Sequence, residues 1–184
     1  MYTSNHSNRL IVLDGVSGSG KSSLLSLAKV NEKYAVIKKR TTRPRRDTDE
    51  SWEFDFCDHI ELKSGTITYS ALGYTYGIDV DSHNNENLNK IFIVVCTDLR
   101  TIKDLRKHYY TKHAYIYRHN TPEELESLLR QRGTDTNQYN ARMAEFYAEK
   151  EEYISRLGSI DAVLLNIHDT DYLFKQLEAV RQKF

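Results

Sequence analysis

The stretch LDGVSGSGKSS, residues Leu13–Ser23, places an apolar segment directly before a glycine-rich turn that ends in Lys-Ser. The run Arg9–Leu13 is typical of a buried parallel strand, and Ser22–Asn31 has the apolar spacing of a helix. Between them, Gly15–Ser22 fits the pattern G-x-x-x-x-G-K-[ST], whose glycines let backbone amides surround an anion at a helix N-terminus. The stretch therefore predicts a loop that binds the phosphates of a nucleotide.

Two side chains of this loop have expected roles. Lys21 is expected to reach the terminal phosphates, and the hydroxyl of Ser22 is expected to bind Mg²⁺. A glycine-rich surface turn is the alternative, but the flanking strand and helix favour the phosphate-binding interpretation. The loop alone does not distinguish a kinase from a GTPase or a mechanical ATPase.

Further apolar runs continue the alternation of strands and helices. Strands are predicted at Tyr34–Lys39, Ile91–Cys96, His113–Tyr117 and Ala162–Leu165, and helices at 121–132, 138–157 and 171–183. The first of these helices starts with T-P-E-E, in which Thr121 caps the helix and Glu124 completes a capping box. The alternation implies an α/β fold with a five-stranded, doubly wound parallel sheet flanked by helices.

The segment 40–83 breaks this alternation. It is rich in Thr, Tyr, Asp and Arg and contains short alternating stretches such as WEFDF. We interpret it as a small inserted acceptor-binding subdomain in a single domain, residues 1–184, whose core comprises 9–39 and 84–184. A short polar loop at about 133–138, between two predicted helices, has the character of a mobile lid.

Composition limits the classes of partner. The 184 residues include 26 basic and 26 acidic side chains, and this zero net charge argues against a nucleic-acid or membrane-surface protein. No apolar run approaches the ~20 residues that span a bilayer, and the first residues are polar, unlike a signal peptide. Two cysteines without metal-type spacing indicate a reducing compartment. We expect a cytoplasmic protein.

Arginines provide a second signal. Arg40–Arg46, RTTRPRR, places four guanidinium groups in seven residues directly after the second predicted strand, and such bidentate donors suit a phosphate group. Arg132 and Arg142 bracket the predicted lid, where they would neutralise charge on a phosphoryl group during transfer. The alternatives are a solvated basic loop and two ordinary surface arginines.

Seven segments, in order, resemble the guanylate kinase family over nearly the whole chain. They are GVSGSGKSS at 15–23, TTRPRR at 41–46, ESWEFDF at 50–56, YG at 76–77, RGTDT at 132–136, ARMAEFYAEKEEY at 141–153 and DAVLLN at 161–166. Seven ordered matches are more specific than one loop. The resemblance implies a P-loop NTPase fold and an ATP-dependent kinase that uses Mg²⁺ and phosphorylates a small phosphorylated acceptor.

The resemblance also implies a set of site residues. The ATP-binding residues would be Gly15, Ser17, Gly18, Ser19, Gly20, Lys21, Ser22, Ser23, Arg132 and Asn166. Arg43 and Arg46 match arginines that hold the acceptor's phosphate, and Tyr76 matches a tyrosine that reaches it; the acceptor site would also include Phe54, Gly77 and Ile78. Arg132 and Arg142 match lid arginines that bridge the two phosphates. The expected catalytic residues are Lys21, Arg43, Arg132 and Arg142.

The sequence departs from the family in the pocket for the acceptor base. Phe54 stands where guanylate kinases have a tyrosine, and Ile78 stands where they have a guanine-reading hydroxyl. Their guanine-reading glutamate falls near Ile67, and their Asp-x-Asp falls near Val94 and Cys96. Because each unpaired buried polar group costs ~1–3 kcal/mol, several such losses predict that guanine selectivity is lost.

Three functions follow from these departures. The first is a nucleoside monophosphate kinase without guanine selectivity. The second is a sugar-phosphate kinase, since Tyr76-Gly77-Ile78 and a shortened loop resemble the ribose 1,5-bisphosphate phosphokinases, although Cys96–Leu99 differs from their pattern. The third is a non-catalytic guanylate-kinase-like binding module, against which Lys21, Ser22 and the lid arginines argue. In each case we expect a monomer or homodimer.

Overall fold

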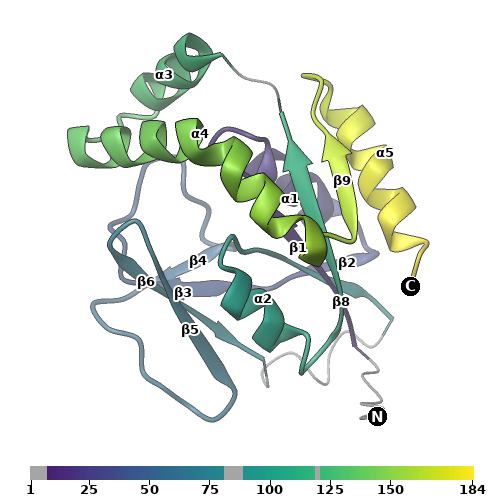
Figure 1. The fold of residues 1–184 in the computed structure, drawn as a ribbon. Helices are drawn as coiled ribbons and strands as arrows, with labels where there is room; N and C mark the ends of the chain where they lie inside the picture. The colour runs from purple at the N-terminus through teal and green to yellow at the C-terminus, as the bar shows by residue number, and fades with distance from the viewer. Residues whose placement is uncertain (1–7, 81–88, 119–120) are drawn as a thin grey trace.

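A five-stranded parallel sheet forms the centre of the molecule (Figure 1). The computed structural model describes residues 8–80, 89–118 and 121–184, with the backbone alone for 149–152. In the order β2-β7-β1-β8-β9, the strands are β2 (Tyr34–Val36), β7 (Ile91–Val95), β1 (Arg9–Asp14), β8 (Tyr110–Tyr117) and β9 (Ala162–Leu165). All neighbouring pairs are parallel. The predicted α/β fold is confirmed.

The helices are α1 (Lys21–Val30), α2 (Leu99–Leu105), α3 (Pro122–Gln131), α4 (Thr136–Arg156) and α5 (Thr170–Arg181), with a 3₁₀ turn η2 (Leu157–Ser159) after α4. The capping box of α3 is present: the Thr121 hydroxyl accepts from the Glu124 amide, and the Glu124 carboxylate accepts from the Thr121 amide. The prediction missed α2, because seven residues are too few to show helical periodicity. Among the described residues, no helix combines the length and apolar character needed to cross a bilayer.

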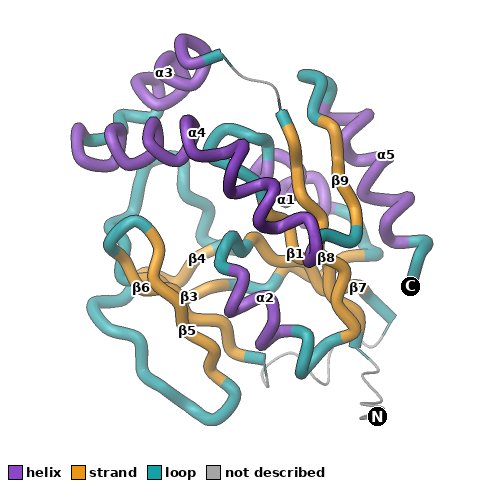
Figure 2. The backbone as a smooth tube through the Cα atoms, viewed as in Figure 1, coloured by secondary structure: helices purple, strands orange, loops and turns teal. Residues whose placement is uncertain are grey.

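The apolar side chains of β1 point to both faces of the main sheet, since successive side chains along a strand point in opposite directions. Ile11 and Leu13 pack against residues of α1 and α5 on one face. Leu10 and Val12 pack against residues of α2 and of the second sheet on the other. Figure 2 shows α2 and the end of α4 in front of the main sheet and α1 behind it. This packing holds the carboxyl end of β1, where the glycine-rich loop begins.

A second, mixed sheet lies beside the first. In the order β4-β3-β6-β5, its strands are β4 (Phe54–Phe56), β3 (Lys39–Thr41), β6 (Tyr74–Asp79) and β5 (Thr66–Ala71). β3 pairs parallel with β4 and antiparallel with β6, and β5 and β6 form a hairpin. The sheet begins one residue before the segment 40–83 that we interpreted as an insertion. The end of that segment falls within 81–88, outside the described residues.

The prediction of one strand over Tyr34–Lys39 is wrong. β2 ends at Val36, and the amide of Ile37 donates to the Ile93 carbonyl at 2.9 Å. The amide of Lys39 donates instead to the Glu53 carbonyl of the second sheet, at 3.0 Å. Ile37, in the segment where the chain passes from the main sheet to the second sheet, is buried in the core. The apolar run therefore continues through this segment, and the sequence pattern does not show that the strand ends.

The predicted lid joins α3 to α4. Residues 133–135 form the connection, and α4 already begins at Thr136. Asp135 caps α4 by accepting a hydrogen bond from the Gln138 amide at 3.0 Å. The segment 133–138 therefore consists of a short turn and the first residues of a long helix.

Candidate functional site

The glycine-rich loop adopts backbone conformations that favour glycine. Gly15 has φ 136° and Gly20 has φ 104°. A Cβ on Gly15 would lie 2.6 Å from the carbonyl oxygen of Ile116, and one on Gly20 would lie 2.5 Å from Asn166 Nδ2. The loop therefore packs directly against the end of β8 and the segment after β9, and no side chain fits at either position.

The first turn of α1 leaves its amides for a ligand. Gly20 is the N-cap and makes no side-chain capping bond, and the first turn contains no acidic residue. Unpaired amides and the helix dipole together form an anion site at a helix N-terminus. Ser22 and Ser23 lie on this turn and line a cavity, so the Ser22 hydroxyl offers the oxygen ligand that Mg²⁺ prefers. These residues fit the phosphates of a nucleotide and a bound Mg²⁺.

Lys21 lies inside the curve of the loop. Its Nζ donates to the carbonyl oxygens of Gly15 at 2.5 Å and Val16 at 2.6 Å. Burial lowers the pKa of Lys21 to about 8, and the negative charge of Asp14 partly opposes this shift. The ammonium therefore carries its charge at neutral pH, within reach of any anion that the loop amides bind.

Helix α4, whose first residues belong to the predicted lid, contacts the loop through its second turn. Arg142 Nη1 donates to Ser17 Oγ at 2.5 Å, and Ser17 Oγ in turn donates to Glu145 Oε2 at 3.4 Å. Burial, followed by the nearby charges of Arg132 and Arg43, lowers the pKa of Arg142, while Glu145 opposes the shift. Arg142 thus contacts the loop through Ser17 and lines the cavity together with Arg43 and Arg132.

Arg43 and Arg46, in the segment after β3, also line the cavity. The guanidinium of Arg43 is almost fully buried and donates to Asp49 Oδ1 at 2.8 Å, while the Arg46 amide donates to Asp49 Oδ2 at 2.7 Å. The Arg46 guanidinium donates to Gln138 of α4. Burial, followed by the charges of Arg43 and Arg142, lowers the pKa of Arg46. Arg43, Arg46 and Arg142 line the same cavity, and such a group of cations favours binding of an anion among them.

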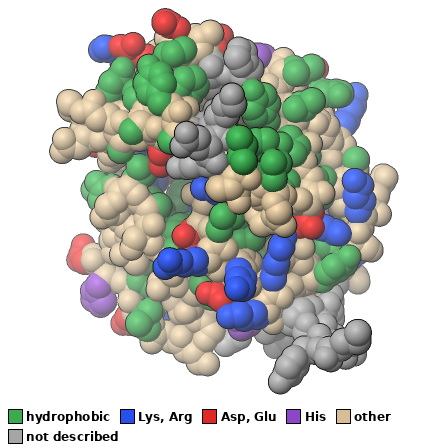
Figure 3. All heavy atoms as spheres, in the orientation of Figure 1, with side chains coloured by type: hydrophobic (Ala, Val, Ile, Leu, Met, Phe, Trp, Pro, Cys, Tyr) green, Lys and Arg blue, Asp and Glu red, His purple; other side chains and the backbone are tan. Residues whose placement is uncertain are grey.

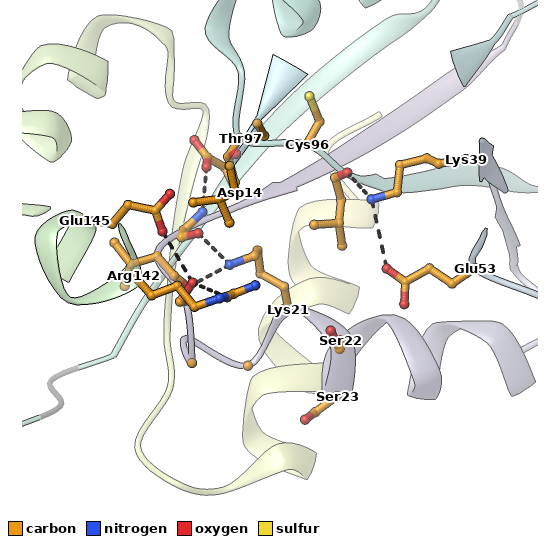
Figure 4. Close-up of a pocket in the computed structure, with 18 of the residues that line it drawn as sticks. Asp14, Lys21, Ser22, Ser23, Lys39, Glu53, Cys96, Thr97, Arg142 and Glu145 are labelled. Carbon is orange, nitrogen blue, oxygen red and sulfur yellow. Dashed lines mark hydrogen bonds and ion pairs between the residues drawn. The ribbon is translucent and has the colours of Figure 1, made fainter. Parts of the chain in front are cut away.

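A cavity of about 570 Å³ is lined by these charged side chains of the loop, of the segment after β3 and of α4 (Figure 4). Most of the site residues expected from the sequence line it: Gly15, Ser17, Gly18, Gly20, Lys21, Ser22, Ser23, Arg43, Arg46, Phe54, Tyr76, Arg132 and Arg142. Segments far apart in the chain therefore place residues of the loop, the second sheet and the helices α3 and α4 around one space.

Two expected ATP-binding residues, Ser19 of the loop and Asn166 after β9, do not face the cavity. Asn166 Nδ2 donates to the Ser19 carbonyl at 2.8 Å, and the Ser19 side chain is fully buried. Neither residue lines the cavity. Asn166 therefore supports the loop backbone rather than facing the cavity.

Gly77 and Ile78, expected in the acceptor pocket, also lie outside the cavity. Ile78 is fully buried in the core with Val80 and Phe92. It lies two residues beyond Tyr76 on the same face of β6, where the main sheet covers it. A Cβ on Gly77 would meet the side chain of Ile60 at 3.0 Å. The replacement of a hydroxyl by Ile78 thus affects core packing rather than the cavity wall.

Two charged residues of the cavity were absent from the sequence prediction. Lys39, the first residue of β3, has a side chain only 4% exposed, and its Nζ donates to the Val95 carbonyl at 2.9 Å. Glu53 Oε1 lies 4.0 Å from that Nζ. Burial lowers the pKa of Lys39 and raises that of Glu53, and the opposite charge of the partner counteracts each shift. In the sequence, Lys39 ended a predicted strand, and no local pattern connected it with Glu53.

Arg118 is a further cavity residue that the sequence prediction missed. It follows β8 directly, and its Nη1 donates to the Gly18 carbonyl at 3.3 Å. Its Nη2 lies 3.0 Å from His168 Nδ1. The signal was present, since an arginine just after a parallel strand lies at the carboxyl edge of the sheet, where the loop also lies.

Asp14, the last residue of β1, anchors the start of the loop. Its Oδ1 accepts from the Gly15 amide at 2.6 Å. Its Oδ2 accepts from Arg156 Nη1 at 2.8 Å and lies 2.9 Å from Nε2 of the fully buried His113. Because Arg156 ends α4, this buried network joins the base of the lid helix to the loop.

Comparisons with known proteins agree with this geometry. A family model described as guanylate kinase matches residues 7–183. The crystal structure of a guanylate kinase from Anaplasma phagocytophilum is similar with a TM-score of 0.60 and 17% identity, over 96% of this chain and 85% of that chain. No curated protein matches the chain. At this identity, the structural likeness supports the fold, and the family match covers nearly every described element.

Proposed function

Since the chain belongs to the guanylate kinase family, we propose that it is an ATP-dependent kinase that transfers a phosphoryl group to an existing phosphate of a small acceptor. One observation carries this proposal: cationic side chains from three separate parts of the chain converge on one cavity. They are Lys21 of the loop, Arg43 and Arg46 after β3, and Arg132 and Arg142 at the lid. Such a cluster neutralises the charge that two phosphate groups bring together.

Alignment and charge neutralisation are sufficient for this chemistry. A phosphate oxygen is already ionised at neutral pH, so the acceptor needs no general base. Lys21 and the loop amides would hold the donor phosphates, and Arg43 and Arg46 would hold the acceptor phosphate. Arg142 would lie between them, with its Nη1 on Ser17. Mg²⁺ bound to Ser22 would supply further positive charge.

Contacts between the lid and the second sheet would keep water out of the cavity. Gln138 of α4 accepts a hydrogen bond from Arg46, and its Nε2 donates to Tyr74 Oη at 3.4 Å. These contacts join the lid to the acceptor side of the cavity. Excluding water matters in a kinase, because water would otherwise accept the phosphoryl group and waste ATP.

The family suggests a nucleoside monophosphate as acceptor, without guanine selectivity because Phe54 lacks a hydroxyl. A sugar phosphate is the second candidate, and the buried Lys39–Glu53 pair favours it. A small acceptor also suits the surface: around α2, on the face that Figure 3 shows, basic and acidic side chains lie side by side and form no continuous basic track.

Replacing Lys21 with Met tests the kinase proposal. We expect ADP formation from MgATP and a mixture of phosphorylated acceptors to fall by a factor of about 10² or more, since one charge-stabilising group is lost. Lys29→Met is the matched control, because Lys29 is exposed in the last turn of the same helix and should leave turnover unchanged. Wild-type protein that binds ATP but forms no ADP with any acceptor would contradict the proposal and favour a binding module.

A further inference from the structure

The Lys39–Glu53 pair has hydrogen-bonding capacity that the protein does not use. Among the residues that the structure describes, Lys39 Nζ donates only to the Val95 carbonyl, at 2.9 Å. The 4.0 Å between Lys39 Nζ and Glu53 Oε1 is too long for a hydrogen bond. An ammonium has three protons, so two remain for groups in the cavity. The Glu53 carboxylate accepts no hydrogen bond from the described part of the chain.

One hydroxyl group fits between the two side chains. A hydroxyl oxygen at about 2.8 Å from both partners would accept from the ammonium and donate to the carboxylate. The 4.0 Å gap between Lys39 Nζ and Glu53 Oε1 is close to the spacing that such a bridge requires. Buried charges cost stability unless they are fully hydrogen-bonded, and the bridge would supply the missing partners.

The aromatic rings beside the pair already have other groups near their faces. Lys39 Nζ lies 4.8 Å from the centroid of the Phe54 ring and 5.9 Å from that of Tyr76. Arg43 Cζ lies 5.2 Å from the Phe54 centroid, and Tyr69 stacks on Tyr76 with 5.2 Å between centroids. A planar base would need a ring face on which to stack, and these contacts compete for it.

We propose that Lys39 and Glu53 determine acceptor specificity by binding a hydroxyl group of a sugar phosphate. The position of the acceptor's phosphate, on Arg43 and Arg46, rests on the proposed function. The hydroxyl and phosphate subsites are adjacent, since Lys39 Nζ and Arg43 Cζ both lie over Phe54. A small sugar phosphate carries hydroxyl groups close to its phosphate, as these subsites require.

Calorimetric binding with AMP-PNP in the donor site tests the inference. The ligands are ribose 5-phosphate, ribose 1,5-bisphosphate and glucose 6-phosphate, compared with AMP, CMP, GMP and UMP. We expect at least one sugar phosphate to bind more tightly than every nucleotide. Lys39→Met and Glu53→Gln should each weaken that binding about 10- to 100-fold, the loss expected for a hydrogen bond to a charged group.

Lys38, the residue before Lys39, and Asp55, two residues after Glu53, provide matched controls. Lys38 and Asp55 form an ion pair with side chains 41% and 59% exposed, outside the cavity. Lys38→Met and Asp55→Asn should leave acceptor binding unchanged. Because Lys39→Met leaves Glu53 as a buried unpaired charge, the double variant Lys39→Met/Glu53→Gln removes both charges at once and guards against misfolding.

Two results would overturn the inference: a nucleotide that binds more tightly than every sugar phosphate, or Lys39 and Glu53 variants that bind sugar phosphates as the wild type does. A turnover assay distinguishes a failure of this inference from a failure of the proposed function. A sugar phosphate that binds through Lys39 but yields no ADP with MgATP contradicts the kinase proposal alone. ADP formation with nucleotides and none with sugar phosphates contradicts the specificity inference alone.

Discussion

At the scale of single residues, the fold changes the chemistry of Lys21. The loop curls around its ammonium, which donates to two loop carbonyls. Burial then lowers its pKa from 10.5 to about 8, against the partial opposition of Asp14. The same position that brings the ammonium to a bound phosphate therefore also brings its titration close to physiological pH.

We expect ATP affinity to fall as the pH rises through about 8. Only the protonated form of Lys21 neutralises phosphate charge, and the free protein loses this proton above its pKa. Each further pH unit should weaken binding by up to about tenfold, until the higher pKa of the complex is reached. Calorimetric titrations with ATP at a series of pH values measure this. The dependence should vanish in Lys21→Met, and an equal dependence there would assign it to another group.

At the scale of elements, a buried network joins α4 to β1. Arg156 at the end of α4 donates to the Asp14 carboxylate, and to the Thr97 carbonyl at 2.6 Å. Asp14 is only 1% exposed, so its charge depends on such partners. The lid helix is thus fixed at its base, while its other end contacts the loop and the second sheet through Arg142 and Gln138.

Arg156→Met should destabilise the protein by about 3–5 kcal/mol, because it removes one partner of a buried carboxylate. Arg130→Met is the control: Arg130 forms an ion pair with Glu126 but its side chain is 73% exposed, so this change should leave the free energy of unfolding nearly unchanged. Urea denaturation of both variants measures the difference in free energy of unfolding. Equal losses in the two variants would mean that the network does not stabilise the fold.

At the scale of the whole molecule, the main sheet, the second sheet and the lid meet around the cavity (Figure 1). A ligand that fills the cavity therefore contacts all three parts. MgATP at about 100 times its dissociation constant should stabilise the protein by about 2.7 kcal/mol, which is roughly 5–10 °C in Tm for a chain of this length. Scanning calorimetry measures the shift. It should shrink when EDTA removes Mg²⁺ and nearly disappear in Lys21→Met; an undiminished shift in Lys21→Met would place ATP elsewhere.

Local patterns were enough to predict most elements and the conformation of the glycine-rich loop. The loop motif needs only neighbouring residues, and the capping box of α3 spans four positions, so both are visible in one short window. The break between β2 and β3 was not visible, because an apolar residue, Ile37, stays buried across the crossing. The sequence also did not show that Ile78 lies in the core rather than in the cavity wall. Strand alternation indicates which residues share a face of β6, but not what packs against that face.

By itself, the sequence determined the order of strand, loop and helix that creates an anion site, and the presence of arginines in numbers that suit phosphate groups. Only the tertiary structure decided which charges meet. Lys39 turns inward because the chain crosses between two sheets there, and it meets Glu53, the residue directly before β4. Asp14 meets Arg156 across 142 positions. Such pairings depend on how distant segments pack, which no local pattern encodes, and they decide which charged groups line the cavity and which support the loop.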